Sequence, residues 1–301
     1  MKHSSLSLRQ LRYFEAVARL GHFGAAAEEC AITQPALSMQ IKELEKTLGA
    51  LLFERRPGET VLTPLGREIA ERVTKILLAT NDLAAIAKHR EKILSGTLSL
   101  GIIPTLAPYI LPSLLGYLQK RYPALRLELR EAQTKAMLHE LSHGGLDLVM
   151  AAITNDLPDL EEQHLFDDRF LLAVPADDTK RSRVDPETLD PGQLILLEEG
   201  HCLRDQALSF CSNERGITKA GLGATSLSTI MQMVANGYGA TFIPEIAVET
   251  EMRGRKLALQ RFTAPEPSRQ IGLVWRKSSP RKKDFEALGA AVKEALKTKR
   301  K

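Results

Sequence analysis

The spacing of apolar residues predicts three short helices at the start of the chain. Apolar side chains recur at helical spacing over 8–20, and Gly21 is a suitable helix stop. A short alanine-rich helix is predicted over 24–30, followed by a tight turn. Thr33 can cap a third helix, in which Pro35 occupies an early position where its missing N–H costs nothing. The inward face of this third helix carries Leu37, Ile41, Leu44 and Leu48.

The second and third helices form the pattern of a helix-turn-helix motif. Outward positions of the third helix carry side chains that can hydrogen-bond base edges or reach phosphates, namely Gln34, Ser38, Gln40 and Lys42. The stretch 51–66, LLFERRPGETVLTPLG, predicts two short strands around a Pro57-Gly58 turn. This hairpin is a wing that carries Arg55 and Arg56. The alternative is a three-helix core with a hairpin that contacts no nucleic acid.

A single long helix is predicted from Pro64 to about Leu94, because no Gly or Pro follows Gly66 in this stretch. Its apolar seam contains Ile69, Val73, Ile76, Leu77, Leu83, Ile86 and Ile93, interrupted by Thr80. A helix about 45 Å long cannot bury such a seam within one small domain. The pattern therefore favours packing against a second copy, and a dimer suits DNA with two half-sites. The alternative is a connector that packs on the rest of the chain.

From Gly96 onward, strands and helices alternate, which predicts an α/β body with parallel strands and ligand sites at their carboxyl ends. The first set comprises strands over 98–103, 125–131 and 146–152 and helices over 108–122 and 134–143. The second set comprises strands over 170–175, 194–199 and 239–244 and helices over 202–213 and 227–236. The chain returns through a strand over 269–277. Two such sets predict two lobes with a cleft, and Thr105 and Thr134 lie where strands of the first lobe lead into helices.

Composition and charge narrow the class of protein. The 301 residues carry a net charge of +4, which combines a basic segment 1–92, an acidic segment 93–275 and a basic segment 276–301. A basic head on an acidic body suggests a polyanion partner for the head, and the basic tail is otherwise a solvated helix end. With no long apolar run, no signal peptide and only three cysteines, we expect a soluble, cytoplasmic protein without a membrane segment.

Two of the three cysteines, Cys202 and Cys211, are candidates for thiol chemistry. Cys202 falls at the end of an apolar strand and the start of a helix, near Arg204, and both features favour the thiolate. His201 and Gln206 add hydrogen-bonding capacity beside it. Cys211 lies nine residues later, so a continuous helix would separate the two thiols by about 13 Å along its axis and point them in opposite directions.

A disulfide requires Cα atoms within about 7 Å, so these two cysteines can pair only if the helix between them is remodelled. Oxidation would then act as a conformational switch, with a sulfenic acid at Cys202 captured by Cys211. The alternative is a pair of inert, buried cysteines. Cys30 is expected to be a small apolar residue in the core of the head. We find no phosphate loop, dinucleotide fingerprint or metal-spaced His/Cys cluster, so we expect no cofactor and no metal.

The segment FGAAAEECAITQPALSMQIKELEKTLGALLFER, followed by LTPLG, resembles the head of LysR-type transcriptional regulators. The resemblance implies that the recognition helix and wing contact operator DNA, through Gln34, Pro35, Ser38 and Arg55, while many relatives have Arg where this chain has Met39. It also implies an all-α winged helix-turn-helix head over 1–63, a linker and dimerisation helix over 64–94, and a two-lobed α/β, periplasmic-binding-protein-like effector domain over 95–301.

The segment GHCLRDQALSFC, with PTLAPYILP and EAQT before it and ATSL and PEPSRQIGLVWR after it, resembles the hydrogen-peroxide-sensing members of that family. The resemblance implies a peroxidatic Cys202, a resolving Cys211 and a reversible disulfide that controls oxidative-stress genes. The peroxide pocket that it implies consists of Thr105, Thr134, His201, Arg204, Asp205, Gln206 and Arg269. In this interpretation the hydroxyls orient the peroxide, Arg269 supports the thiolate and Asp205 assists proton release.

The implied partners are double-stranded operator DNA, hydrogen peroxide, further copies of the chain in a dimer of dimers, and RNA polymerase. Two other functions stay open at this point. One is a LysR-type regulator that binds a small organic effector in the cleft between the lobes, with incidental cysteines. The other is a thiol enzyme such as a peroxidase with an accessory DNA-binding head, which we disfavour because no second catalytic constellation supports it.

Overall fold

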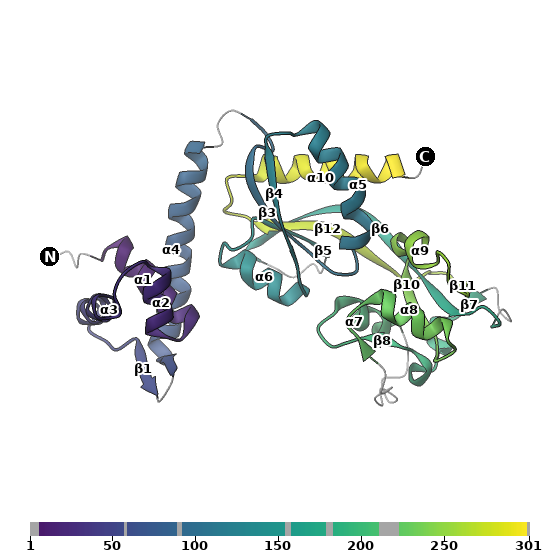
Figure 1. Cartoon of the computed structure of the whole chain (residues 1–301), viewed down its shortest axis with the longest axis horizontal. Helices are drawn as coiled ribbons and strands as arrows, with labels where there is room; N and C mark the ends of the chain where they lie inside the picture. The colour runs from purple at the N-terminus through teal and green to yellow at the C-terminus, as the bar shows by residue number, and fades with distance from the viewer. Residues whose placement is uncertain are drawn as a thin grey trace. The chain divides into compact units, whose positions relative to one another are not determined.

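The computed structural model describes residues 6–56, 59–88, 92–153, 158–178, 183–210 and 223–299 (Figure 1). The chain divides into two compact units, residues 1–88 and residues 89–301, here called the head and the body. Among the described residues, no helix combines the length and apolar character needed to span a membrane.

The head contains the three predicted helices, α1 (Leu8–Leu20), α2 (Phe23–Glu29) and α3 (Gln34–Leu48). Local chemistry sets their ends. Ser7 and Gln10 form a capping box at the start of α1, and Gly21 ends it in the left-handed conformation at φ 63°. The predicted inward residues of α3 pack in a core around Phe14, whose ring centroid lies 5.3 Å from that of Phe53.

The wing is confirmed as a hairpin of β1 (Phe53–Arg56) and β2 (Glu59–Leu62), antiparallel with Phe53 opposite Leu62. Thr63 joins it to the following helix, since its hydroxyl donates to the carbonyl of Leu51 at 2.9 Å and accepts from the amide of Gly66 at 2.8 Å. Gly66 is required there, because a Cβ atom would lie 2.1 Å from the carbonyl oxygen of Leu52.

The long helix α4 spans Pro64–Lys88. The first half of its seam packs on the core of the head through Val73, while Ile76, Leu83 and Ile86 are 45%, 66% and 48% exposed. The predicted end near Leu94 is wrong. Leu94 has a left-handed φ of 52° and is buried in the core of the body, so it belongs to the body and not to a helix.

The described part of the body contains a mixed sheet of eight strands. Its order is β4 (Leu125–Glu131), β3 (Gly96–Ile102), β5 (Leu148–Ala152), β12 (Ser268–Arg276), β6 (Leu160–Pro175), β11 (Leu257–Phe262) and β7 (Arg183–Val184), with β10 (Thr241–Pro244) also on β6. The prediction of parallel strands holds for β3 with β4 and β5 and is wrong for β12, β6 and β10, which pair antiparallel.

Strand β6 begins at Leu160, ten residues before the predicted strand, and β12 lies between β5 and β6 and runs antiparallel to both. A short parallel pair, β8 (Leu196–Leu197) with β9 (Gly223–Ala224), replaces the longer strand predicted over 194–199. The 3-10 turns η1 (Pro186–Thr188) and η2 (Pro191–Gln193) precede it.

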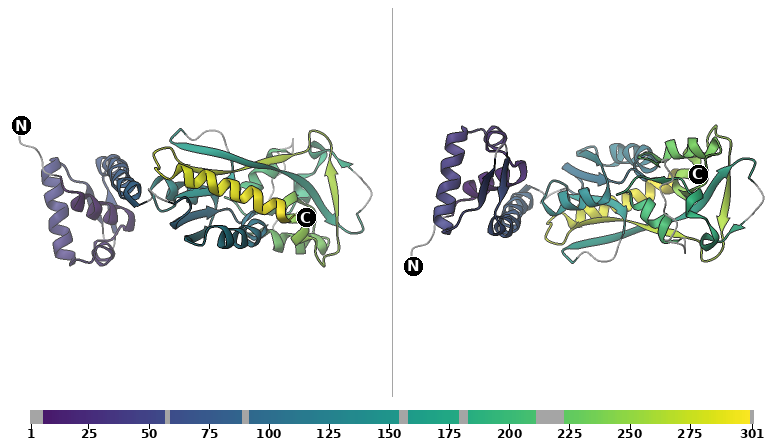
Figure 2. Two further views of the ribbon diagram at one scale, coloured as in Figure 1. Left: turned by 90° about the horizontal axis from the view of Figure 1, so that it is seen from above. Right: turned by 90° about the horizontal axis from the view of Figure 1, so that it is seen from below.

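Two apolar cores lie in the body, as the two predicted lobes require. The first core packs β3, β5 and β12 against α5 (Ala107–Arg121), α6 (Thr134–Ser142) and α10 (Lys282–Lys299). The second core includes α7 (Cys202–Ser209), α8 (Leu227–Ala235) and α9 (Glu245–Glu251). Strand β6 contributes Leu165 to the first core and Phe170 and Leu172 to the second. Figure 2 shows α10 lying along the sheet, where it contacts β6, β12 and α5.

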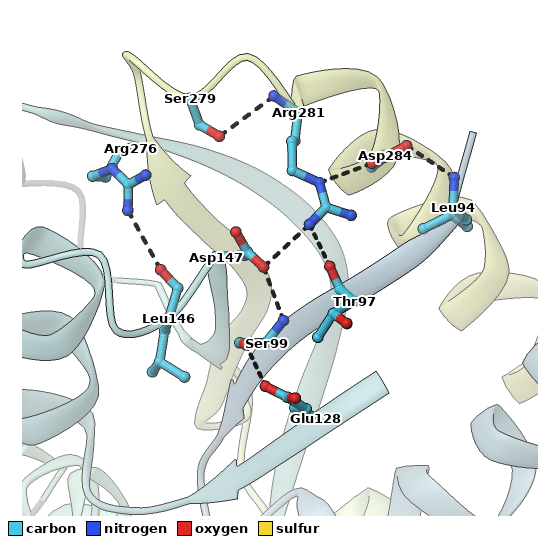
Figure 3. Close-up of polar contacts among 10 residues, drawn as sticks. All are labelled: Leu94, Thr97, Ser99, Glu128, Leu146, Asp147, Arg276, Ser279, Arg281 and Asp284. Atoms are coloured by element: carbon cyan, nitrogen blue, oxygen red, sulfur yellow. Dashed lines mark hydrogen bonds and ion pairs between the residues drawn. The ribbon is translucent and has the colours of Figure 1, made fainter. Parts of the chain in front are cut away.

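A buried polar network fixes the beginning of the body to α10 (Figure 3). The amide of Leu94 donates to Oδ1 of Asp284 at 2.9 Å, and Nε of Arg281 donates to Oδ2 of the same carboxylate at 3.0 Å. Nη1 of Arg281 also lies 3.3 Å from Oδ2 of Asp147, which accepts the amide of Ser99. One guanidinium thus neutralises two carboxylates that hold the backbone on either side of the start of β3.

We expect Arg281→Met to lower the free energy of unfolding of the body by about 3–5 kcal/mol, because two buried or half-buried carboxylates lose their cation. Urea unfolding followed by fluorescence of Trp275, the only tryptophan and part of the first core, measures this change. The control is Lys282→Met, whose side chain is exposed and pairs with Glu161 at the surface. Equal midpoints for the two variants would contradict the assignment.

Candidate thiol site and nucleic-acid interface

Five of the predicted pocket positions lie at element ends that face the same region of the body. Thr105 is buried between β3 and α5, and Thr134 is the first residue of α6. Cys202 is the first residue of α7, with the buried His201 as its N-cap, and Arg269 is the second residue of β12. Although α7 belongs to the second core, the side chain of Cys202 packs against the first.

Arg269 is the buried cation of this site. Its Nε and Nη2 atoms donate to Oδ2 of Asp168 at 3.0 and 2.8 Å. Its Nη1 donates to the hydroxyl oxygen of Thr105 at 2.8 Å, and its Nη2 donates to the carbonyl oxygen of Thr105 at 3.2 Å. Its guanidinium carbon lies 5.8 Å from the ring centroid of Phe170. Arg269 therefore joins β12, β6 and the segment before α5.

Asp168 is a site residue that the sequence reasoning missed. It lies opposite Arg269 in the β6–β12 register, and its second oxygen accepts the backbone amide of Ile246, at the start of α9, at 3.1 Å. Burial raises the pKa of Asp168, while Arg269 and the Ile246 amide oppose that shift. The available signal was an acidic residue two positions before the apolar run 170–174. Its partner is 101 residues away and follows only from the pairing of β6 with β12.

Burial raises the pKa of the Cys202 thiol, and the Arg269 charge, the Thr134 hydroxyl and the Leu203 amide only partly offset it. Asp205 raises the pKa further. The helix start favours the thiolate as predicted, through the Leu203 amide, but burial outweighs this effect and the pKa is raised. Arg204 instead donates from Nη1 to the carbonyl of Leu197 at 3.1 Å, so Arg269 is the relevant cation.

Two buried polar side-chain atoms accompany the thiol. Within the described part of the chain, Oε1 of Gln206 makes no hydrogen bond, and the Thr134 hydroxyl interacts with the Cys202 thiol and with no nitrogen or oxygen atom. Gln206 lies one helical turn after Cys202 on α7, and Thr134 is close enough to influence the thiol. Buried polar groups are usually satisfied, so this arrangement suits a small hydrogen-bonding molecule beside the sulfur.

The second cysteine of the proposed pair, Cys211, lies outside the described residues. The helix predicted to continue to Asn213 ends at Ser209, with Phe210 as its C-cap. Phe210 packs on the second core, with its ring centroid 5.9 Å from that of Phe170. The thiols of Cys30 and Cys202 are free. Cys30 packs against the core of the head, as predicted, and burial raises its pKa.

The proposed DNA-contacting face of α3 is accessible. Gln34, Pro35 and Lys42 are exposed, and Ser38 and Gln40 are half-buried. Thr33 caps this helix through a long hydrogen bond of 3.4 Å from the amide of Ala36. Arg55 lies on β1, although its side chain is not among the described parts.

A separate cavity of about 810 Å³ lies over β6, between α9 and α10. Its lining includes Leu165, Phe166, Asp168, Ile246 and Leu296, with charged residues from both helices. None of the predicted pocket residues lines it, but its lining shares Asp168, the partner of Arg269, with the thiol site.

Comparison with known proteins shows to which family the chain belongs. The model of the bacterial regulatory helix-turn-helix protein of the lysR family matches residues 8–67, and that of the LysR substrate binding domain matches residues 92–297. The chain belongs to the LysR family. This LysR protein is accordingly one of a family of DNA-binding transcriptional regulators and not of enzymes.

The relatives of this LysR protein include peroxide-responsive regulators. It is 40% identical over 297 residues, 96% of this chain and 94% of the relative, to a probable hydrogen peroxide-inducible genes activator of Streptomyces viridosporus. It is 37% identical to the transcriptional dual regulator OxyR of Escherichia coli, over 97% of this chain and 96% of that one. A hydrogen-peroxide-bound cysteine-to-serine variant of Corynebacterium glutamicum OxyR matches with a TM-score of 0.67 and 36% identity, over 97% and 93% of the two chains.

We expect alkylation of Cys202 by iodoacetamide to rise with pH with a midpoint above the ordinary thiol value of about 8.5, because burial disfavours the thiolate. Mass spectrometry of the Cys202 peptide from the reduced protein measures the rate at each pH. Replacing the cation, in Arg269→Gln, should move the midpoint higher still. A midpoint below 7 in the unmodified protein would show instead that Arg269 outweighs burial.

Proposed function

We propose that this chain senses hydrogen peroxide through a reversible disulfide between Cys202 and Cys211 and thereby controls the transcription of oxidative-stress genes. The observation that carries the proposal is the Cys202 thiol, which lies at the start of α7 near Arg269 and the buried hydroxyl of Thr134. Similarity to the OxyR proteins supports the same interpretation.

The proposed reaction balances without a cofactor. The thiolate of Cys202 attacks one oxygen of the peroxide, an S–O bond forms, the O–O bond breaks, and the leaving hydroxide takes a proton to become water. The thiol of Cys211 then attacks the sulfenic acid, an S–S bond forms and a second water leaves. Two thiols supply the two electrons that reduce the peroxide.

Each pocket residue would have its own role in the reaction with peroxide. Thr105 accepts a hydrogen bond from Arg269 at its oxygen, which leaves its own hydroxyl hydrogen available to donate to the peroxide. Thr134 contributes a second hydroxyl, and Arg269 supports the thiolate. Asp205 receives the proton, while His201, Arg204 and Gln206 complete the enclosure.

Disulfide formation would require the end of α7 to rearrange. The seven steps from Cys202 to Ser209 span about 10.5 Å of helix, and Cys211 is two residues beyond, whereas a disulfide requires Cα atoms within about 7 Å. Phe210 would leave its contact with Phe170 as the last turn unwinds. Oxidation would thus cause a conformational change at the edge of the second core.

The remaining partners follow from the head and from the family. Gln34, Pro35, Ser38, Gln40 and Arg55 would contact double-stranded operator DNA, and the exposed seam of α4 would join two chains. We infer a dimer of dimers in the cytoplasm that contacts RNA polymerase, with domain limits at 1–63, 64–94 and 95–301 and a periplasmic-binding-protein-like body.

One equivalent of hydrogen peroxide added to the reduced protein should produce a Cys202–Cys211 disulfide, detected by peptide mass spectrometry. Cys202→Ser should abolish the bond and the peroxide-dependent change in footprint on a duplex selected from random-sequence DNA, while DNA binding itself remains. Cys30→Ser is the matched control and should respond normally. Absence of the bond, together with an unchanged footprint, would exclude the proposal.

Charge placed in the exposed seam of α4 should dissociate the dimer. We expect Leu83→Asp to shift the sedimentation coefficient toward that of a smaller species, because a carboxylate would be buried without a partner between the two helices. Asn81→Asp places the same charge about 160° around the helix from Leu83, at an exposed position, and should leave the sedimentation coefficient unchanged. Identical behaviour of the two variants would argue against this interface.

The cavity over β6 favours a second candidate function, a regulator that binds a small organic effector in the body. Its volume of about 810 Å³ is within the usual range for ligand pockets. A metabolite that alters DNA binding by the Cys202→Ser variant would support this candidate over the thiol switch.

A further inference from the structure

The guanidinium of Arg269 has almost no hydrogen-bonding capacity left for the thiol. Arginine has five N–H donors. Asp168 receives two of them, from Nε and Nη2, and Thr105 receives two more, from Nη1 and Nη2. One Nη1 hydrogen remains. The side chains of Arg269 and Asp168 are both fully buried, so no water screens this pairing.

We infer that Asp168 is a positioning residue that competes with the sulfur of Cys202 for the guanidinium of Arg269, and so sets the peroxide concentration at which the thiol reacts. The consequence for peroxide rests on the proposed function. The competition itself can be measured on the thiol alone.

The physical basis is one buried cation shared by two anions. With Asp168 ionised, the pair is neutral, and deprotonation of Cys202 would add an uncompensated negative charge to the same region. None of the other groups that act on the sulfur supplies a positive charge: the Thr134 hydroxyl and the Leu203 amide favour the thiolate as neutral donors, and Asp205 of α7 disfavours it. His201 is the N-cap of the same helix. The raised pKa of Cys202, despite a neighbouring arginine, agrees with this account.

Asp168→Asn tests the inference because it keeps the shape and one oxygen acceptor while removing the charge. The thiolate of Cys202 then becomes the buried counterion of Arg269. We expect the midpoint of the iodoacetamide pH profile, measured on the reduced full-length chain, to fall by about one pH unit, which is about a tenfold faster alkylation at neutral pH. Asp168→Glu keeps the charge and should restore a midpoint near that of the unmodified protein.

Glu251→Gln is the matched control, because it shows what the loss of a buried carboxylate does when that carboxylate has only a structural role. Glu251 is also a buried carboxylate, and it accepts hydrogen bonds from Tyr109 at 2.9 Å and from Ser228 at 2.7 Å. Both variants should melt at a lower temperature, but only Asp168→Asn should shift the pH profile. An unchanged or higher midpoint in Asp168→Asn would overturn the inference.

If Asp168→Asn fails to fold, the double variant Asp168→Asn with Arg269→Gln provides the test. It removes both charges and so leaves no unpaired buried charge. If Asp168 cancels the effect of Arg269 on the thiol, removal of both should change the alkylation midpoint by less than half a pH unit, about a threefold change in rate. A rise of more than one unit would mean that Arg269 acts on the thiol without competition, and would refute the inference.

The response of the variants to hydrogen peroxide distinguishes a failure of this inference from a failure of the proposed function. Asp168→Asn should form the Cys202–Cys211 disulfide at a lower peroxide concentration than the unmodified protein. If alkylation shifts as expected while no chain forms that disulfide, the competition stands and the proposed sensing function fails.

Discussion

The ion pair between Arg269 and Asp168 is the interaction on which the body depends. It lies where β6 and β12 pass between the two apolar cores, and it connects four segments, because Thr105 and the amide of Ile246 complete its hydrogen bonds. A buried pair contributes little net stability, but loss of either partner is costly. The register of the two strands, the start of α5 and the start of α9 are therefore held by one pair of charges.

The same pair bears on the environment of the Cys202 thiol. This thiol is half-buried, burial disfavours its ionised form, and the charge of Arg269 restores part of the loss. Because Asp168 accepts two of the N–H groups of Arg269, residues of β6 and β12 influence a thiol that belongs to α7.

Much of the fold follows from local sequence. Ser7, Gly21 and Thr33 mark the helix ends of the head, and apolar spacing identifies the buried face of α3. The direction of β12 and the beginning of β6 do not follow, because antiparallel pairing between segments about a hundred residues apart leaves no local pattern. Asp168 was missed for that reason. The effect of the helix start on the Cys202 pKa was predicted, but the larger effect of burial was not, because that burial arises from the first core, which sequence spacing near residue 202 does not reveal.

Strand β6 runs unbroken for 16 residues through both cores, and this continuity has a mechanical consequence. A body whose halves share an uninterrupted strand resists bending at its middle, so a clamshell motion would cost the hydrogen bonds of the sheet. The eight-residue helix α7, beside the two-residue strands β8 and β9, is a far cheaper unit to unfold locally. Substitutions in that small unit can therefore change how readily it unfolds while the stability of the scaffold is left intact.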